Sequence, residues 1–247
     1  MDQSILISFD AALPLDAAPR IDIYAAPHKA LRALMFDTVT RVGGADASDA
    51  ASLSEALAQA RLLLEVARHH VAHENDHVHP LIEAHRPGGA CQTADDHVGH
   101  LEAIARLEAE VDAVERSAPA QRDAALYRLY LRLARFVAEN LEHMEVEETH
   151  NTALLRDACD DAEIGAMLQA LIASIQPDIG RVFHRWMYSA MNHGERVGML
   201  SAIRAGAPAE VFDAEVAAAR DVLAPRAWAR LANALDLPAG AGVVEAW

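Results

Sequence analysis

The sequence predicts an all-α fold. Of its 247 residues, 52% are hydrophobic, whereas only 12 are glycine and 10 are proline, and many segments are rich in alanine. This balance favours long helices over a loop-rich or disordered chain. Apolar residues also recur at helical spacing in four long stretches that are joined by short connections. These observations predict an up-down-up-down four-helix bundle with a C-terminal helical extension.

Proline and glycine mark the ends of the expected bundle helices. The first helix starts at Pro27, which suits a first turn, and ends at Gly43 and Gly44. Inside the second helix, Pro80 would introduce a kink. The third opens at Thr93 as an N-cap, and Pro119 closes the connection that follows it. The expected ranges are 27–44, about 52–86, 93–117 and 121–158.

Three regions are expected along the chain: an N-terminal arm over residues 1–26, the bundle over 27–158, and an extension over 159–247 that packs on the bundle. Within the arm, ILISF forms either a short strand or a packed tail. The aromatic stretch FHRWMY, with Trp228 and Trp247, predicts a packed core for the extension. Its helices are expected at about 162–175, 178–191, 195–205, 208–220 and 225–235.

Charge and cysteine content argue against several classes of function. A formal net charge of -16 at pH 7 would repel phosphate backbones and anionic lipids, so neither nucleic acid nor a membrane is an expected partner. Cys91 and Cys159 lack metal-type spacing, and we expect two ordinary thiols. With no signal-peptide pattern and no run of about 18 apolar residues, we expect a cytoplasmic protein.

Histidines and acids gather near the end of the second helix, where residues 69–80 (HHVAHENDHVHP) hold five of the 13 histidines. At roughly 100° per residue, Glu74 and His77 fall within about 40° of His70, and His73 lies about 60° away. They interrupt the stripe of Leu63, Val66 and Leu81 that should be buried. The residues expected to point into solvent are His69, Asp76 and His79.

The fourth helix repeats this layout, because His143, Glu147 and His150 share one face with Phe136 and Leu154. Both helices therefore carry the pattern HxxxExxHxxxL. Burying imidazoles and carboxylates is unfavourable unless they are paired or bind cations, and a dinuclear metal centre would satisfy them. Histidines on a solvated helix face are the alternative, but they would not be expected twice at matching register.

Histidines in the first turns of the other two helices would meet these clusters, because the start of a helix faces the end of its antiparallel neighbour. These residues are His28 and His97. His100 competes with His97, but the run from His97 to Ser117 better matches the run from Gln121 to His143. The candidate metal ligands are therefore His28, His70, Glu74, His77, His97, His143, Glu147 and His150.

The ordered set of PHKALR, HVAHE followed by HP, and HMEVEE resembles the hemerythrin-like, or HHE cation-binding, domain over roughly residues 25–155. The resemblance implies a hemerythrin-type bundle with two iron ions bridged by Glu74 and Glu147, although manganese and zinc also suit such donors. His77 and His150 stand where many members have an apolar residue. They are either additional ligands or hydrogen-bond partners of ligands.

The resemblance implies a protein that binds, carries or senses oxygen or a related small diatomic molecule. An enzyme is the alternative, either ferritin-like or active in peroxide decomposition, oxidation or nitrosative-stress repair. The ferritin-like reading rests on ExxH at Glu74–His77 and Glu147–His150. That class also needs a glutamate from the first helix, which offers only Asp37. For the extension, we expect that it completes the fold or forms a homodimer interface. The alternative is a regulatory role, in which the metal state changes a surface that binds a partner.

Overall fold

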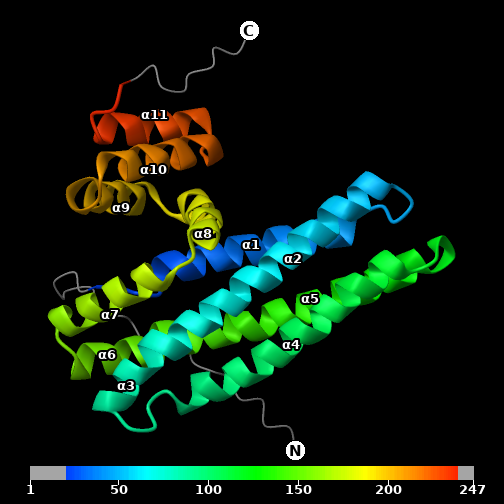
Figure 1. Ribbon diagram of the computed structural model, residues 1–247, viewed down its shortest axis with the longest axis horizontal. Coiled ribbons are helices and arrows are strands. Elements are labelled where there is room, and N and C mark those ends of the chain that lie inside the picture. Colours follow the sequence, from blue (N-terminus) through cyan, green and yellow to red (C-terminus); the bar gives the residue numbers. More distant parts are fainter. Residues whose placement is uncertain (1–20, 239–247) are drawn as a thin grey trace, which may run out of the picture.

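The computed structural model describes residues 21–238, and every regular element within that range is helical. No strand occurs there, and the expected ILISF element lies outside the described residues. None of the described helices is long and apolar enough to cross a membrane. Four long segments lie side by side (Figure 1). They are α1 (Ala25–Gly44); α2 (Ala50–His73), η1 (Glu74–Val78) and α3 (His79–His85); α4 (Cys91–Arg116); and α5 (Pro119–Val146), η2 (Glu147–Asn151) and α6 (Thr152–Ala158).

All four long segments start about two residues earlier than expected, and the starts of the third and fourth are informative. The third segment begins at Cys91, so Thr93 is not its N-cap. Instead, Thr93 is buried in the first turn and donates its hydroxyl to the carbonyl of Ala90. The fourth segment begins at Pro119 itself. Proline is suited to this position because its missing N–H would have no partner in the first turn.

A continuous apolar core holds the four segments together. α1 packs against α2 and α5, and α4 packs against the same two helices. Leu64, Ile104 and Leu129, from three different segments, are all fully buried in this core. Burying one such side chain contributes about 1.5–3 kcal/mol. The core therefore fixes the relative height of the segments, and with it the height of every polar side chain that they carry.

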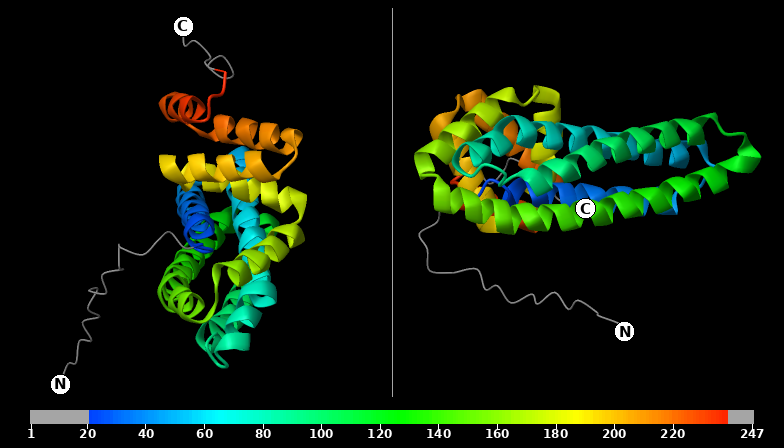
Figure 2. Two further views of the ribbon diagram at one scale, coloured as in Figure 1. Left: turned by 90° about the vertical axis from the view of Figure 1, so that its left-hand side faces the viewer. Right: turned by 90° about the horizontal axis from the view of Figure 1, so that it is seen from below.

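Five shorter helices follow, and the last four of them lie on one side of the long segments (Figure 2). α8 packs along α1, and its Phe183 and Trp186 contact the main core. Tyr188 and Trp228 belong to a second core within the extension. The FHRWMY stretch thus contributes side chains to two apolar cores. The helices are α7 (Asp161–Ser174), α8 (Pro177–Ala190), α9 (His193–Gly206), α10 (Ala209–Val222) and α11 (Pro225–Ala234).

Two π-helical turns, η1 and η2, interrupt the long segments at matching places. The N–H of His79 donates to the carbonyl of Glu74, and that of Thr152 donates to the carbonyl of Glu147, five residues back in each case. This is the hydrogen-bond pattern of a π-turn, which adds one residue to a helical turn. All side chains beyond each turn are consequently rotated from the positions that an uninterrupted α-helix would give them.

Candidate metal centre

Six side chains from the four long segments converge in the interior. Their ligand atoms form two groups of four, and within each group all atoms lie within 4.8 Å of one another. Glu74 and Glu147 belong to both groups, so the groups share two carboxylates. The first group is His28, His70, Glu74 and Glu147; the second is Glu74, His97, His143 and Glu147.

Glu74 presents one carboxylate oxygen to each group. Its Oε1 lies 3.2 Å from Nε2 of His70 and 3.7 Å from Nε2 of His28. Its Oε2 lies 3.4 Å from Nε2 of His97. The side chain thus spans the space between the two pairs of imidazoles.

Glu147 repeats this arrangement from the opposite helix. Its Oε2 lies 3.4 Å from Nε2 of His28, whereas its Oε1 lies 3.3 Å from Nε2 of His143 and 3.8 Å from Nε2 of His97. Each group therefore offers two imidazole nitrogens and two carboxylate oxygens. This is a suitable donor set for a divalent transition metal.

Buried atoms without hydrogen-bond partners indicate that the cluster fits metal ions. Glu147 is 0% exposed and Glu74 is 3% exposed. Each buried polar atom without a partner costs about 1–3 kcal/mol. Cations held by these donors would offset the carboxylate charge and satisfy the nitrogen lone pairs. The unpartnered atoms are Nε2 of His28 and His70, Oε2 of Glu74, and both carboxylate oxygens of Glu147.

Polar groups outside the cluster hold three of its four imidazoles through Nδ1. An acceptor at Nδ1 keeps the ring proton there and leaves the Nε2 lone pair directed at the cluster. Arg32 in turn donates two hydrogen bonds to the carboxylate of Glu148, at 2.6 and 2.9 Å. The Nδ1 contacts are His28 with Glu148 at 3.1 Å, His97 with Asn75 at 2.8 Å, and His143 with Asp96 at 3.2 Å.

The Nδ1 partners of these imidazoles were not predicted from the sequence. Asn75 and Glu148 directly follow the two shared glutamates, so their positions were visible in the sequence. Their contacts lie on other helices, with His97 and His28 respectively, and therefore depend on the fold. The only available signal was that a polar residue follows each shared glutamate.

Burial and neighbouring charges shift the pKa values of the cluster in different directions. Burial lowers the pKa of His70 to about 3. Burial opposes protonation of His28 as well, but the carboxylates of Glu148 and Glu74 raise its pKa to about 9. Burial, and then the charge of Glu74, raises the pKa of Glu147. Before a cation binds at neutral pH, His28 therefore carries a proton and His70 is neutral.

His77 and His150 do not join the cluster, and the prediction that they face inward is wrong. It assumed an uninterrupted α-helix, whereas the extra residue of each π-turn puts Val78 and Asn151 on the inner face. Nε2 of His77 lies 3.2 Å from Oγ of Ser174 instead, and His150 is exposed. The same rotation buries Ile82 and Leu155 in place of Leu81 and Leu154.

Two other histidines are buried beside the cluster. His79, which was expected in solvent, is 6% exposed and stacks on the ring of His97 with centroids 4.9 Å apart. His100 is 5% exposed and meets the ring of His143 edge-on at 4.8 Å. Burial lowers the pKa of each to about 4, so both are neutral at pH 7. They pack against candidate ligands and restrict the orientation of those rings.

Leucine substitutions on the second long segment test which of its histidines face the cluster and which face away from it. His77→Leu is expected to leave the metal content unchanged, because its imidazole lies against Ser174. His70→Leu is the matched control and should lose metal, since its Nε2 faces Glu74. Metal per chain measured after purification and desalting checks both variants. Loss of metal from His77→Leu at unchanged helicity would contradict the placement, and His150→Leu gives the same test on the fourth segment.

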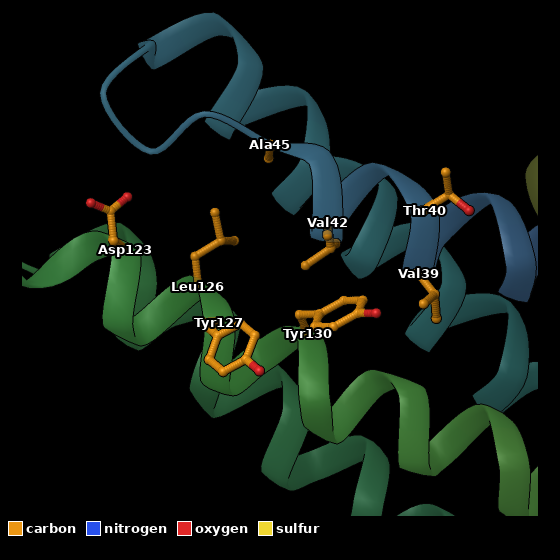
Figure 3. A pocket seen from close by; sticks show the side chains of 9 residues that line it. Val39, Thr40, Val42, Ala45, Asp123, Leu126, Tyr127 and Tyr130 are labelled. Atoms are coloured by element: carbon orange, nitrogen blue, oxygen red, sulfur yellow. The ribbon is translucent and has the colours of Figure 1, made fainter.

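A surface pocket lies at the other end of α1 and α5, away from the cluster (Figure 3). Val42, Leu126 and Tyr130 are among the residues that line it, and Asp123 is its one carboxylate. Neither histidine nor cysteine lines it. This pocket therefore lacks the donors found in the interior cluster, which remains the better candidate for metal chemistry.

Comparison with known proteins gives one match. The family model described as hemerythrin HHE cation binding domain matches residues 20–155. This range contains all six side chains of the cluster together with their outer partners. Searches of the curated proteins and of the solved structures gave no match.

Proposed function

The chain belongs to the hemerythrin HHE cation-binding domain family, and from that premise we propose that its cluster holds two iron ions. One observation carries the proposal: each of Glu74 and Glu147 offers one oxygen to each pair of histidines. The implied architecture is an up-down-up-down four-helix bundle over residues 27–158. An arm over 1–26 and an extension over 159–247 complete the proposed organisation.

The proposed role is to bind or sense oxygen or a related small molecule. When bound, two iron ions would supply reversible electron transfer to such a ligand. Four imidazoles and two carboxylates carry fewer negative charges than the carboxylate-rich donor set of ferritin-like sites. This difference favours reversible binding of a small ligand over oxidation of a substrate. Around it, Glu148 and Asn75 orient the imidazoles, and Phe136 belongs to the apolar core next to His100. The two polar groups keep the rings oriented, and the apolar ring of Phe136 helps to keep water away from them.

A peroxide-processing enzyme is the second candidate, and buried polar groups near the cluster favour it. Tyr24 is 2% exposed, and its ring lies 5.1 Å from that of His28. Asn151 donates to the hydroxyls of Tyr24 and Thr93, at 3.4 and 3.3 Å, while its own buried Oδ1 lacks a partner. A protic ligand such as peroxide can donate to that oxygen, whereas dioxygen cannot.

The ferritin-like form of the enzyme has less support. Its ExxH motifs require His77 and His150 at the metal, and both point away from the cluster. Asp37, the only carboxylate that the first helix offers, accepts hydrogen bonds from Arg41 and Gln59 instead. The donors that distinguish a ferritin-like site therefore lie elsewhere.

Anaerobic purification followed by metal quantification tests the proposal. We expect two iron ions per chain and an optical charge-transfer band that appears with oxygen and disappears when oxygen is removed. Rapid consumption of added peroxide, without reversible oxygen binding, would favour the second candidate. Fewer than two metals per chain, together with unchanged stability after chelation, would contradict both.

Metal affinity is expected to rise with pH, because His28 must lose a proton before its Nε2 can bind a cation. Its pKa is raised to about 9, so it is protonated in the metal-free protein at lower pH. Releasing one proton should increase the apparent affinity about tenfold per pH unit below 9. Competition with a chelator of known affinity at several pH values measures this slope.

Glu148→Gln provides the control for this pH dependence. The substitution removes a carboxylate that raises the pKa of His28 to about 9, so the rise in affinity should end at a lower pH than in the wild-type protein. Affinity should also fall by about 10–100-fold, the usual effect of losing a group that orients a ligand. If the rise in affinity ends at the same pH, about 9, in Glu148→Gln as in the wild-type protein, His28 is not the group that releases the proton.

A further inference from the structure

We propose a second, separate metal site formed by His85, Cys159 and Glu163, which would bind a borderline divalent cation such as Zn²⁺. One ligand atom from each residue lies within 4.8 Å of the other two. The three donors come from the end of α3, the residue that follows α6, and the first turn of α7. The fold thus brings the nitrogen of His85 to the sulfur and the oxygen of two residues that lie more than 70 positions further along the chain.

The spacing of these donors suits a tetrahedral zinc ion. Zinc bonds of about 2.0–2.3 Å to nitrogen, oxygen and sulfur place neighbouring ligand atoms roughly 3.3–3.8 Å apart. Nε2 of His85 already lies 3.2 Å from Oε1 of Glu163. The ligand atom of Cys159 lies within 4.8 Å of those of His85 and Glu163. Bringing the three atoms to the spacing of a tetrahedral zinc ion therefore requires a movement of about 1 Å. Three protein ligands would leave the fourth position to water.

Glu163 is held in place for this role by the start of its own helix. Its Oε2 accepts the backbone N–H of Asp160 at 3.0 Å, and the side chain of Asp160 caps the helix in return. Oε1 remains directed at His85. A carboxylate ligand whose second oxygen is hydrogen-bonded is a common arrangement around protein metals, because that bond fixes the orientation of the ligand.

Little stability is lost when a cation replaces the ion pair between His85 and Glu163. The side chains of His85 and Glu163 are 30% and 43% exposed, and ion pairs near the surface contribute about 0–1 kcal/mol. Cys159 is 6% exposed, so it adds a donor that is largely shielded from water. On binding, the thiol releases its proton to solvent and a sulfur–metal bond forms, with no change of oxidation state.

This site is independent of the interior cluster and does not rest on the proposed function. His85 lies eleven residues beyond Glu74, which corresponds to about 16 Å along a helix at 1.5 Å per residue. None of its three residues belongs to either group of the cluster. An ion here would join α3 to the junction of α6 and α7, and so fix the start of the extension against the long segments.

Cobalt titration of the full-length, reduced, iron-loaded protein tests the proposal, because a cobalt–thiolate bond gives a sulfur-to-metal charge-transfer band. We expect one Co²⁺ per chain with this band, and its removal by added Zn²⁺. Cys91→Ser is the matched control and should keep the band, whereas Cys159→Ser should lose it. Glu163→Gln should weaken Co²⁺ binding at least tenfold, because it retains an oxygen for capping but removes the charge.

Several outcomes would overturn the proposal. They are the absence of a thiolate band in the wild-type chain, a band that persists in Cys159→Ser, and a band lost in Cys91→Ser. If Cys159→Ser does not fold, as judged by circular dichroism, His85→Gln replaces it and should weaken Co²⁺ binding at least tenfold. Iron content measured in the same samples reports on the interior cluster separately, so failure at one site is distinguishable from failure at the other.

Discussion

Glu147→Ala is expected to abolish binding of the metal pair while the helices remain folded. Glu147 supplies one oxygen toward His28 and the other toward His143, so the substitution removes a donor from both groups. The remaining donors would include only one shared carboxylate, Glu74. We expect iron content to fall from two to at most one per chain, and the affinity for that remaining ion to fall at least 100-fold. Metal analysis of protein reconstituted anaerobically measures both changes.

The fold should survive this substitution, because the buried carboxylate of Glu147 destabilises the folded protein when no cation is bound. Burial and Glu74 raise the pKa of Glu147, and both of its oxygens lack hydrogen-bond partners. Glu142→Ala is the matched control on the same helix, since Glu142 is exposed and should leave metal content unchanged. Two tightly bound ions in Glu147→Ala would show that the carboxylate does not join the two groups.

Removing the metal is expected to destabilise the wild-type protein by several kcal/mol. A ligand that binds only the folded state stabilises it by about 4 kcal/mol when its free concentration is 1,000 times its dissociation constant. At roughly 2–4 °C per kcal/mol for a chain of this size, the melting temperature should fall by about 8–16 °C. Thermal unfolding followed by circular dichroism, with and without a chelator, measures the change.

Two controls make this measurement specific to the cluster. Chelation of Glu147→Ala should change the melting temperature far less than chelation of the wild-type chain. Cys159→Ser removes a donor of the proposed second site, so it should still show a large decrease on chelation. Equal melting temperatures for wild-type protein with and without metal would indicate that no ion occupies the interior cluster.

Much of the helical layout was predictable because strong local signals mark it. Pro27, Gly43 and Gly44 bound the first helix closely, and the expected helices of the extension lie within about two or three residues of α7 to α11. The six converging side chains were also predictable. Helical spacing selected two histidines and one glutamate on each of two helices, and in each case the first histidine and the glutamate do converge. The expected antiparallel arrangement then placed His28 and His97 at the same height.

The remaining features depend on tertiary structure. No local signal distinguished a π-turn from an α-turn at Glu74, because the residues there are compatible with either hydrogen-bond pattern. That change of register moved His77 outward. His79 was expected in solvent, yet it stacks on His97, which comes from a separate helix. Contacts of this kind depend on the fold and leave no periodic trace in the sequence.

The sharing of the two carboxylates also has a consequence for assembly. α1 and α2 form one helical hairpin and α4 and α5 form another, and each hairpin supplies two imidazoles and one glutamate. Because each glutamate turns one oxygen toward the opposite hairpin, neither hairpin alone has a complete donor set. Docking of the two hairpins and binding of the proposed ions would therefore be thermodynamically linked, so that bound metal would join the two halves of the bundle.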